Sequence, residues 1–307
     1  MIIITAEVHP VLIEGLEKQG LAVDYAPAIT YAELRTRIAE ATGLVVTTRI
    51  KVDKELLAMA DKLEWIGRLG SGLELIDIPY AESKGIRCFS TPEGNRNSVA
   101  EQAVGMLISL MHNITRSYME VREGKWLRNQ NRGTELKGKT VGIIGYGNTG
   151  SAFVSLLQSF GVTILAYDKY RTGFGDKTVR EASLEQVCRY ADIISFHVPL
   201  TEETRHMANA AFFSACGQQP YILNTSRGEV VDTRALLEAL DAGKLRGAGL
   251  DVLENERIDA LSPEEEAEFK ALLAHSNVII TPHIGGYSHE AYRLMSVLLL
   301  EKLGLQP

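Results

Sequence analysis

Short apolar, β-branched runs alternate with amphipathic helical patterns along almost the whole chain. In the first hundred residues, strands are predicted at Ile2–Thr5, Leu44–Thr47 and Leu63–Gly67, and helices at Val11–Gln19 and Lys54–Ala60. Strands that are apolar on both faces and separated by helices are typical of parallel sheets built from βαβ units. The pattern therefore predicts an α/β protein.

The alternation is more regular in the second part of the chain. Strands are predicted at Thr140–Ile144, Thr163–Tyr167, Ile193–Phe196, Tyr221–Asn224, Ala248–Val252 and Val278–Thr281. Helices are predicted between them at Thr149–Phe160, Leu184–Ala191, Thr233–Ala242 and Pro263–Ala274. Six strands alternating with helices match a complete dinucleotide-binding sheet.

A long helical pattern, Ser98–Glu123, joins the two parts, and Ser98 with Glu101 fits a capping box at its start. The polar stretch 124–138 that follows predicts a loop or linker. A last helix, Ala291–Leu303, comes directly after the final strand. This helix could cross back onto the first part, which would make the first domain discontinuous.

The composition narrows the class of protein. A chain of 307 residues with 45% hydrophobic residues is long enough for two domains. The 32 basic and 39 acidic residues give a net charge of −7, which disfavours nucleic acid as a partner but does not exclude a small anionic substrate.

The chain has no apolar run approaching the roughly 18 residues of a membrane span, and its start lacks the features of a signal peptide. Its cysteines, Cys88, Cys188 and Cys216, are far apart in sequence and form no CxxC motif. We therefore expect a cytoplasmic protein without a membrane partner, in a reducing compartment, and without a metal site.

A glycine-rich turn marks the candidate cofactor site. Gly145, Gly147 and Gly150 form a GxGxxG motif directly after an apolar strand and at the start of a helix, with Tyr146, Asn148 and Thr149 between them. Such a turn brings the backbone and a helix N-terminus against a pyrophosphate. Asp168, 18 residues after Gly150, ends the next strand, where a carboxylate binds the adenosine ribose hydroxyls and repels a 2′-phosphate. NAD is therefore favoured over NADP, and the nearby Arg171 could soften that preference.

Three later strands run into unusual polar groups. Arg227 follows the strand ending at Asn224, the acids Glu254 and Glu256 follow the next strand, and His283 follows the last. Ligands bind at the carboxyl ends of parallel strands, so the topology can bring these groups together. An Arg can bind the carboxylate of a 2-keto acid, and a His can exchange a proton with the hydroxyl. A neighbouring acid would hold the His in orientation.

These features occur together in one family. The chain resembles the D-isomer-specific 2-hydroxyacid dehydrogenases, and it is closest to the short D-3-phosphoglycerate dehydrogenases that lack a regulatory domain. The resemblance extends over nearly the whole chain. Its matching stretches are Gly70–Gly72, Gly94–Gln102, Leu136–Gly150, His197–Thr204, Asn224–Asp232, Gly247–Glu256 and Thr281–Gly286.

The resemblance implies that Arg227, Glu256 and His283 are catalytic, and it selects Glu256 rather than Glu254. It places Asp251 near the nicotinamide carboxamide. It assigns His197 to the cofactor side, which rules out a catalytic role for that histidine. Further cofactor contacts are implied at Val198, Pro199, Thr204, Thr225 and Gly285.

The resemblance also implies a Rossmann NAD-binding domain, residues 98–284, inserted into a smaller flavodoxin-like substrate domain formed by residues 1–97 and 285–307. A cleft between the domains and a homodimer are expected. The sequence departs from the family at Arg257, where Pro is frequent, and in the polar stretch 258–266 that follows. Because the sequence given stops at Pro307, no regulatory domain with a serine feedback site is expected.

The substrate is less well defined by the sequence. The resemblance implies that the amides of Ser71 and Gly72 bind the substrate carboxylate. Arg68 and Arg49 occupy places where cations resemble phosphate ligands, which favours 3-phosphoglycerate. Glyoxylate, hydroxypyruvate and pyruvate, the last as in a D-lactate dehydrogenase, remain alternatives. A protein of another class, which senses NAD(H) and recruits partners, is a second hypothesis.

Overall fold

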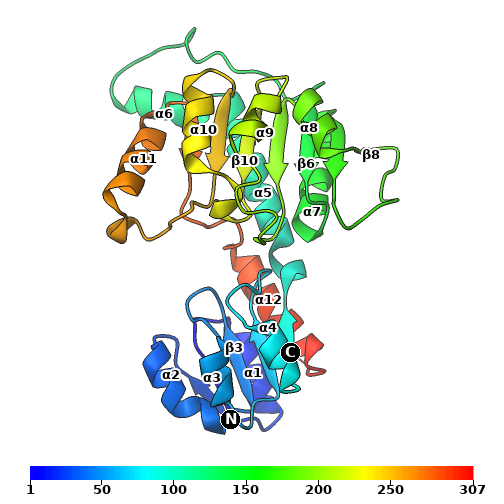
Figure 1. Ribbon diagram of the computed structural model, residues 1–307, viewed down its shortest axis with the longest axis vertical. Helices are drawn as coiled ribbons and strands as arrows, with labels where there is room; N and C mark the ends of the chain where they lie inside the picture. The colour runs from blue at the N-terminus through cyan, green and yellow to red at the C-terminus, as the bar shows by residue number, and fades with distance from the viewer. Residues whose placement is uncertain (307) are drawn as a thin grey trace. The chain divides into compact units, whose positions relative to one another are not determined.

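The computed structural model describes residues 1–306 and divides the chain into two compact units. Unit 1 consists of residues 1–98 and 286–307, and unit 2 of residues 99–285. Both are α/β, and in each unit helices cover both faces of a parallel sheet (Figure 1). The predicted fold class, a Rossmann domain inserted into a smaller flavodoxin-like domain, is confirmed.

The sheet of unit 1 has five parallel strands in the order β2-β1-β3-β4-β5, which is the flavodoxin-like order. The strands are β1 (Ile2–Ile4), β2 (Val23–Tyr25), β3 (Gly43–Val46), β4 (Trp65–Arg68) and β5 (Arg87–Ser90). The sequence pattern predicted β1, β3 and β4. It missed the two edge strands, which are short and only partly buried.

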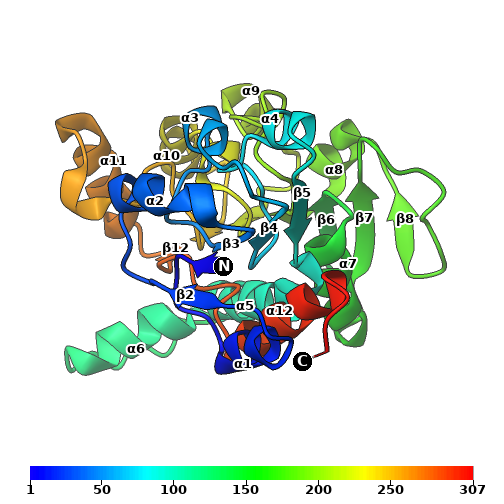
Figure 2. The ribbon, with the colours of Figure 1, turned by 90° about the horizontal axis from the view of Figure 1, so that it is seen from below.

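Helices pack on both faces of this sheet (Figure 2). One apolar core lies under α2 (Tyr31–Arg37), α3 (Lys54–Ala58) and α4 (Ile78–Ser83). The other lies under α1 (Pro10–Lys18) and α12 (His289–Lys302), whose Leu299 and Leu300 are fully buried. Because α12 comes from the end of the chain, both chain ends contribute to unit 1.

The sheet of unit 2 has seven parallel strands in the order β12-β11-β10-β9-β6-β7-β8, rather than the predicted six. The strands are β6 (Thr140–Ile144), β7 (Thr163–Tyr167), β8 (Val179–Glu181), β9 (Ile193–Phe196), β10 (Tyr221–Asn224), β11 (Gly247–Leu250) and β12 (Val278–Ile280). The additional strand, β8, is a three-residue edge strand with two exposed residues. This is the Rossmann order, with the change of direction between β6 and β9.

The two faces of this sheet bury separate apolar cores. One core lies under α8 (Leu184–Tyr190), α9 (Ala210–Ala215), α10 (Thr233–Asp241) and α11 (Pro263–Ala274). The other lies under α5 (Pro92–Met111) and α7 (Asn148–Leu157). Among the described residues, no helix is long and apolar enough to cross a membrane.

The predicted long helix, Ser98–Glu123, is two helices. The first, α5, begins at Pro92, so Ser98 lies inside it and is not a cap. Proline is tolerated in a first helical turn, where its missing N–H is not needed. α5 ends at Met111, and Asn113, in the left-handed region with φ of 52°, directly precedes α6 (Ile114–Arg122). Stretch 124–138 is irregular as expected, but it lies within unit 2.

Candidate active site

The glycine-rich turn lies at the carboxyl end of β6, where the strand order of unit 2 changes direction. Gly145 has φ of 94°, and a Cβ there would lie 2.4 Å from the carbonyl oxygen of His197 on β9's side of the turn. A Cβ on Gly150 would lie 2.1 Å from the carbonyl oxygen of Gly145. At Gly147, by contrast, a Cβ would meet no atom within 4 Å. Two glycines therefore allow close packing, and the third leaves the backbone open to a ligand.

Asp168 is held beside this turn by main-chain amides. Its Oδ2 accepts a hydrogen bond from the amide of Tyr146 at 2.8 Å, and its Oδ1 accepts from the amides of Tyr170 and Arg171 at 2.9 and 3.1 Å. The guanidinium of Arg171 donates to the carbonyl oxygen of Tyr146 and lies 5.9 Å from the centre of its ring. The acid and the cation named in the sequence thus lie in one loop next to the glycines.

His197 is buried beneath the turn, next to the ring of Phe153. Its Nε2 is 2.9 Å from the hydroxyl of Ser195, whereas its Nδ1 is buried without a hydrogen-bond partner among the described residues. Burial lowers the pKa of His197 to about 3, so the ring is neutral in the folded protein. The hydroxyl of Thr225, which follows the neighbouring strand β10, is also buried without a partner in the part of the chain described. These two buried polar atoms are suited to a site in which a bound ligand supplies their hydrogen-bond partners.

The segment between His197 and β10 folds on itself around Thr204. The hydroxyl of Thr204 donates to the carbonyl oxygen of Pro199 at 2.6 Å and accepts from the amide of Thr201 at 2.8 Å. Val198 is partly buried and lies close to Gly145. A Cβ on Gly145 would lie 2.9 Å from Cγ1 of Val198. The residues assigned to the adenosine side therefore form one ordered turn next to the glycine loop.

Asn224 braces the loop that carries Arg227, a role that was not predicted from the sequence. Asn224, fully buried, accepts from the amide and the hydroxyl of Ser226 and donates to the carbonyl oxygen of Arg227 at 2.9 Å. Gly228 packs so tightly that a Cβ would lie 1.9 Å from the carbonyl oxygen of Leu253. The feature of the sequence that could have indicated this role is the amide side chain of Asn224 at the end of an otherwise apolar strand.

Asp251 organises the loop after β12. It is 2% exposed, and its carboxylate accepts from the hydroxyl of Thr281 at 2.5 Å and from the amides of Ile284 and Gly285 at 3.0 and 2.7 Å. Thr281 in turn accepts from the amide side chain of Gln102 on α5 at 3.3 Å. The sequence predicted only a place near the cofactor for Asp251. It did not predict that Asp251 and Thr281 hold the loop after β12 by hydrogen bonds.

His283 and Glu256 form a pair at the end of these loops. Nδ1 of His283 lies 2.9 Å from Oε2 of Glu256, and both side chains are partly exposed. The other candidate acid, Glu254, is engaged elsewhere: it pairs with His206 and accepts from the amide of Thr233 at 3.3 Å. Since β10, β11 and β12 are neighbours in the sheet, the loops of Arg227, Glu256 and His283 lie along one edge.

The substrate residues named for unit 1 lie on the loop after β3, at the end of β4 and on the loop after β4. The guanidinium of Arg49 donates to the carbonyl oxygens of Thr5 and Pro27 at 2.7 and 2.8 Å. The guanidinium of Arg68 donates to the carbonyl oxygen of Leu69 at 3.0 Å. A Cβ on Gly70, with φ of 133°, would collide with the Arg68 side chain.

Ser71 and Gly72 follow Gly70 in this loop. The hydroxyl of Ser71 donates to Oδ1 of Asn95 at 3.1 Å, which ties the loop to the first turns of α5.

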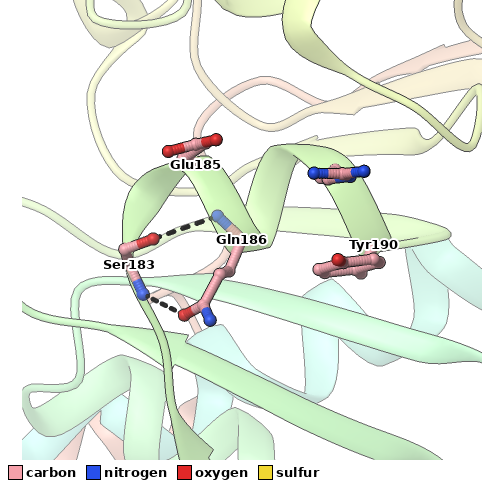
Figure 3. A pocket seen from close by; sticks show the side chains of 5 residues that line it. Ser183, Glu185, Gln186 and Tyr190 are labelled. Carbon is pink, nitrogen blue, oxygen red and sulfur yellow. Dashed lines mark hydrogen bonds between the residues drawn. The ribbon is translucent and has the colours of Figure 1, made fainter.

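Two surface hollows of unit 2 do not include Arg227, Glu256 or His283 among their lining residues. One, of about 320 Å³, is lined in part by His206, Glu254 and Phe269. The other lies over the solvent-exposed side of α8 (Figure 3) and is lined by Ser183, Glu185, Gln186, Arg189 and Tyr190. Among the described residues, no three His, Cys, Asp or Glu side chains gather as a metal site requires.

Comparisons with known proteins agree with this geometry. The chain is 39% identical to a hydroxypyruvate reductase of Thermotoga maritima over 88% of this chain and 86% of that protein. It is 35% identical to a D-3-phosphoglycerate dehydrogenase of Methanocaldococcus jannaschii over 98% of this chain, but it spans only 56% of that protein. Among solved structures, it matches a D-lactate dehydrogenase of Aquifex aeolicus complexed with NAD and lactic acid. That match has a TM-score of 0.87 and 28% identity, and it covers 99% of this chain and 94% of the other.

A family model described as "D-isomer specific 2-hydroxyacid dehydrogenase, NAD binding domain" matches residues 104–285. The match includes the glycine turn, Asp168 and the loops of the three candidate catalytic residues. The expected cofactor, NAD, is thus confirmed at the level of the family. The chain belongs to the D-isomer-specific 2-hydroxyacid dehydrogenases.

Proposed function

We propose that the chain is an NAD-dependent oxidoreductase that interconverts a D-2-hydroxy acid and the corresponding 2-keto acid. The observation that carries this proposal is the contact of 2.9 Å between Nδ1 of His283 and Oε2 of Glu256. A carboxylate on one ring nitrogen orients the imidazole and leaves Nε2 for proton exchange with a substrate hydroxyl. NAD, when bound, supplies the hydride acceptor or donor for C2.

Each of the three candidate residues has a separate role in this proposal. His283 gives a proton to the carbonyl oxygen of a keto acid, or takes it from the hydroxyl in the reverse direction. Glu256 holds the orientation of His283 through the contact at Nδ1. Arg227 binds the substrate carboxylate with its planar fork and polarises the neighbouring carbonyl.

The proposed cofactor residues lie at the glycine turn and at the carboxyl ends of the strands on either side of it. The open backbone at Gly147 and the amides of Asn148 and Thr149 at the start of α7 suit a pyrophosphate, and Asp168 suits the ribose hydroxyls. We assign the remaining cofactor contacts to Tyr146, His197, Val198, Pro199, Thr204, Thr225, Asp251 and Gly285. The division into an NAD-binding domain, residues 98–284, and a substrate domain formed by the remaining residues belongs to the same proposal.

For the substrate, we favour 3-phosphoglycerate. The name of the Methanocaldococcus relative supports this choice. A second support is Arg68, a cation at the end of β4, just before the loop of Ser71 and Gly72, whose amides we assign to the substrate carboxylate. Arg49 contributes a second cation. Its guanidinium donates to the carbonyl oxygens of Thr5 and Pro27, which lie on other loops of unit 1.

The same assay tests two alternatives to this function. Reduction of glyoxylate, hydroxypyruvate or pyruvate is favoured by the names of the Thermotoga and Aquifex proteins. An NAD(H)-sensing protein that recruits partners would retain the fold and the cofactor residues without turnover.

The test is a steady-state assay of NADH oxidation with 3-phosphohydroxypyruvate, hydroxypyruvate, glyoxylate and pyruvate. We expect turnover with a 2-keto acid, and the highest kcat/KM with the phosphorylated one.

Arg68→Ala should raise KM for 3-phosphohydroxypyruvate at least tenfold more than for glyoxylate. Arg87→Ala, on the neighbouring strand β5, is the matched control and should change neither. An equal effect of Arg68→Ala on both substrates would remove the phosphate role. Tight NADH binding without turnover on any substrate would favour the sensing protein.

We further propose a homodimer formed through the segment of α6. This helix has no buried residue, and its neighbourhood exposes Ile114, Tyr118, Met119, Val121 and Trp126. Trp126 is 83% exposed. A second copy of the chain is the occupant we infer for this apolar surface, in agreement with the dimers that the family resemblance implies.

A further inference from the structure

Two cysteines of unit 2 that have no part in the proposed reaction contact the same apolar core. Cys188, on α8, is 3% exposed, and Cys216, directly after α9, is partly buried. They are 28 positions apart in the sequence, yet α8 and α9 lie side by side on one face of the sheet (Figure 1). Both are free thiols, and the thiol of Cys216 donates a hydrogen bond of 3.4 Å to the carbonyl oxygen of Phe212 on α9.

The backbone holds the two cysteines together. The amide of Gly217 donates to the carbonyl oxygen of Cys188 at 3.0 Å, so the residue after Cys216 is bound directly to the residue that carries the other thiol. A Cβ on Gly217 would lie 2.7 Å from the carbonyl oxygen of Arg189, which leaves no room for another side chain. The side chain of Gln218 also donates to that carbonyl oxygen, at 3.3 Å.

The helix that carries Cys188 is itself firmly placed. Its first turn is fixed by a capping box, in which Ser183 and Gln186 exchange hydrogen bonds (Figure 3). Glu185, Arg189 and Tyr190 project to solvent, whereas Val187 and Cys188 are buried in the core. Cys188 therefore lies on the buried side of α8 and is not among the residues that line the surface hollow.

The thiols are chemically unequal. The neighbouring Cys216 side chain lowers the pKa of Cys188, whereas the neighbouring Cys188 side chain and burial raise the pKa of Cys216. Cys188 is therefore the thiol of the pair that ionises more readily. A nucleophile with an adjacent resolving thiol is the arrangement in which oxidation stops at a disulfide.

We propose that Cys188 and Cys216 form a redox-active dithiol that a hydroperoxide converts to a disulfide between α8 and the end of α9. One thiol gives up its proton, and its sulfur attacks the peroxide, whose O–O bond breaks. The sulfur becomes a sulfenic acid, and the hydroxide that leaves takes up the thiol's proton as water. The second thiol then attacks that sulfur, the S–S bond forms and a second water leaves. The sulfur pair loses two electrons and two protons, and hydrogen peroxide is reduced to two waters. A dithiol reductant reverses the reaction.

The closed ring would enclose residues 188–216, which include β9 and the proposed adenosine residues Val198, Pro199 and Thr204. The modification therefore crosslinks the frame on which that turn is built, without consuming a proposed catalytic residue.

The experiment uses the full chain, reduced, freed of reductant and treated with hydrogen peroxide at low protein concentration. Thiols are then counted after denaturation, and peptides are mapped by mass spectrometry. The protein has three thiols. We expect one to remain, with Cys188 and Cys216 joined in one peptide pair that is lighter by two hydrogens and recovers with dithiothreitol.

Matched variants separate this outcome from general oxidation. Cys88→Ser removes the thiol of unit 1 and should retain closure, because burial raises the pKa of Cys88 to about 11 and it has no part in the pair. Cys188→Ser and Cys216→Ser should each abolish the linked peptide. Persistence of all three thiols, disulfide-linked dimers, or sulfinic acid on one cysteine in place of the linked peptide would each overturn the proposal.

Discussion

The main-chain amide of His283 donates a hydrogen bond of 2.8 Å to the carbonyl oxygen of Asp251. His283 has φ of 54°, a left-handed conformation that costs a residue with a side chain of the order of 1 kcal/mol or more. The carboxylate of Asp251 then binds the amides of Ile284 and Gly285, the next two residues. One buried acid therefore imposes the backbone conformation from which the proposed proton donor projects.

Asp251→Asn should weaken this loop. The substitution replaces one acceptor oxygen with an NH₂ group, so an amide or the hydroxyl of Thr281 would face a donor instead of an acceptor. We expect the free energy of unfolding to fall by about 2 kcal/mol, measured by urea titration, and kcat to fall as well. Asp232→Asn is the control, because that residue caps α10 and Asn caps equally well. Equal losses in the two variants would contradict the bracing role.

The assignment of the acid can be tested with two neighbouring glutamates. Glu256→Gln keeps the shape but removes the charge beside His283, so we expect a loss of roughly tenfold or more in kcat. Glu254→Gln should retain turnover, because Glu254 pairs with His206. His283→Gln should reduce kcat by about 10²–10⁴ while the Kd for NADH, from fluorescence titration, is unchanged. A larger loss of kcat in Glu254→Gln than in Glu256→Gln would show that the assignment of Glu256 is wrong.

Substitutions at two glycines of the turn should affect NADH binding and the stability of the fold differently. Gly147→Ala adds a methyl group where no protein atom lies within 4 Å, so the fold should keep its stability while the Kd for NADH rises. Gly150→Ala forces a Cβ to 2.1 Å from a carbonyl oxygen and should cost about 1–3 kcal/mol of stability. Urea titration and NADH titration on both variants check this. A stable Gly147→Ala protein with unchanged NADH affinity would argue against pyrophosphate at that backbone.

His197 should make the protein acid-sensitive. Its pKa is about 3 in the folded state, below the roughly 6.5 of an unfolded chain, so the unfolded state takes up the proton first. Its contribution is constant above about pH 6.5 and declines by up to about 1.4 kcal/mol per pH unit as the pH falls toward 3. Urea titrations at pH 7, 6 and 5 should therefore show a shallower decline in His197→Gln than in the wild type. Parallel declines would refute the buried neutral ring.

The proposed dimer depends on an exposed surface. Trp126→Glu places a charge in the apolar region around α6, and we expect it to shift sedimentation equilibrium from dimer to monomer without loss of secondary structure. Tyr170→Glu is the control, since Tyr170 is also largely exposed but lies in the loop after β7. A monomeric wild type, or dissociation by both variants, would contradict the proposal.

Much of unit 2 could be predicted because its strands are apolar on both faces and short polar turns bound them. β6, β7, β9 and β10 begin and end where the pattern placed them. β8 was missed because an edge strand needs burial on only one side, and Arg180 and Glu181 in it are exposed. The start of α5 was misplaced because Ser98 and Glu101 imitate a cap inside a longer helix.

The chemistry of the site was partly visible in the sequence. The residue types at the strand ends indicated Arg227, an acid and His283, but spacing alone could not choose between Glu254 and Glu256. The contacts separate the two glutamates, since only Glu256 lies against His283. Asn224 and Thr281 were not singled out because their partners are main-chain groups and a buried carboxylate, which are brought together only by the fold.

The packing of α12 into unit 1 has a consequence for synthesis. Ile2, Ile4 and Leu12 belong to a core that Leu299 and Leu300 complete. At about 5–20 residues per second, a ribosome needs roughly 10–40 seconds to travel from unit 1's first segment to that helix. During this interval the nascent first segment has an uncovered apolar face, while unit 2 emerges with all seven of its strands. The later part of the chain is therefore able to fold first, and the earlier part is the one that needs protection from aggregation.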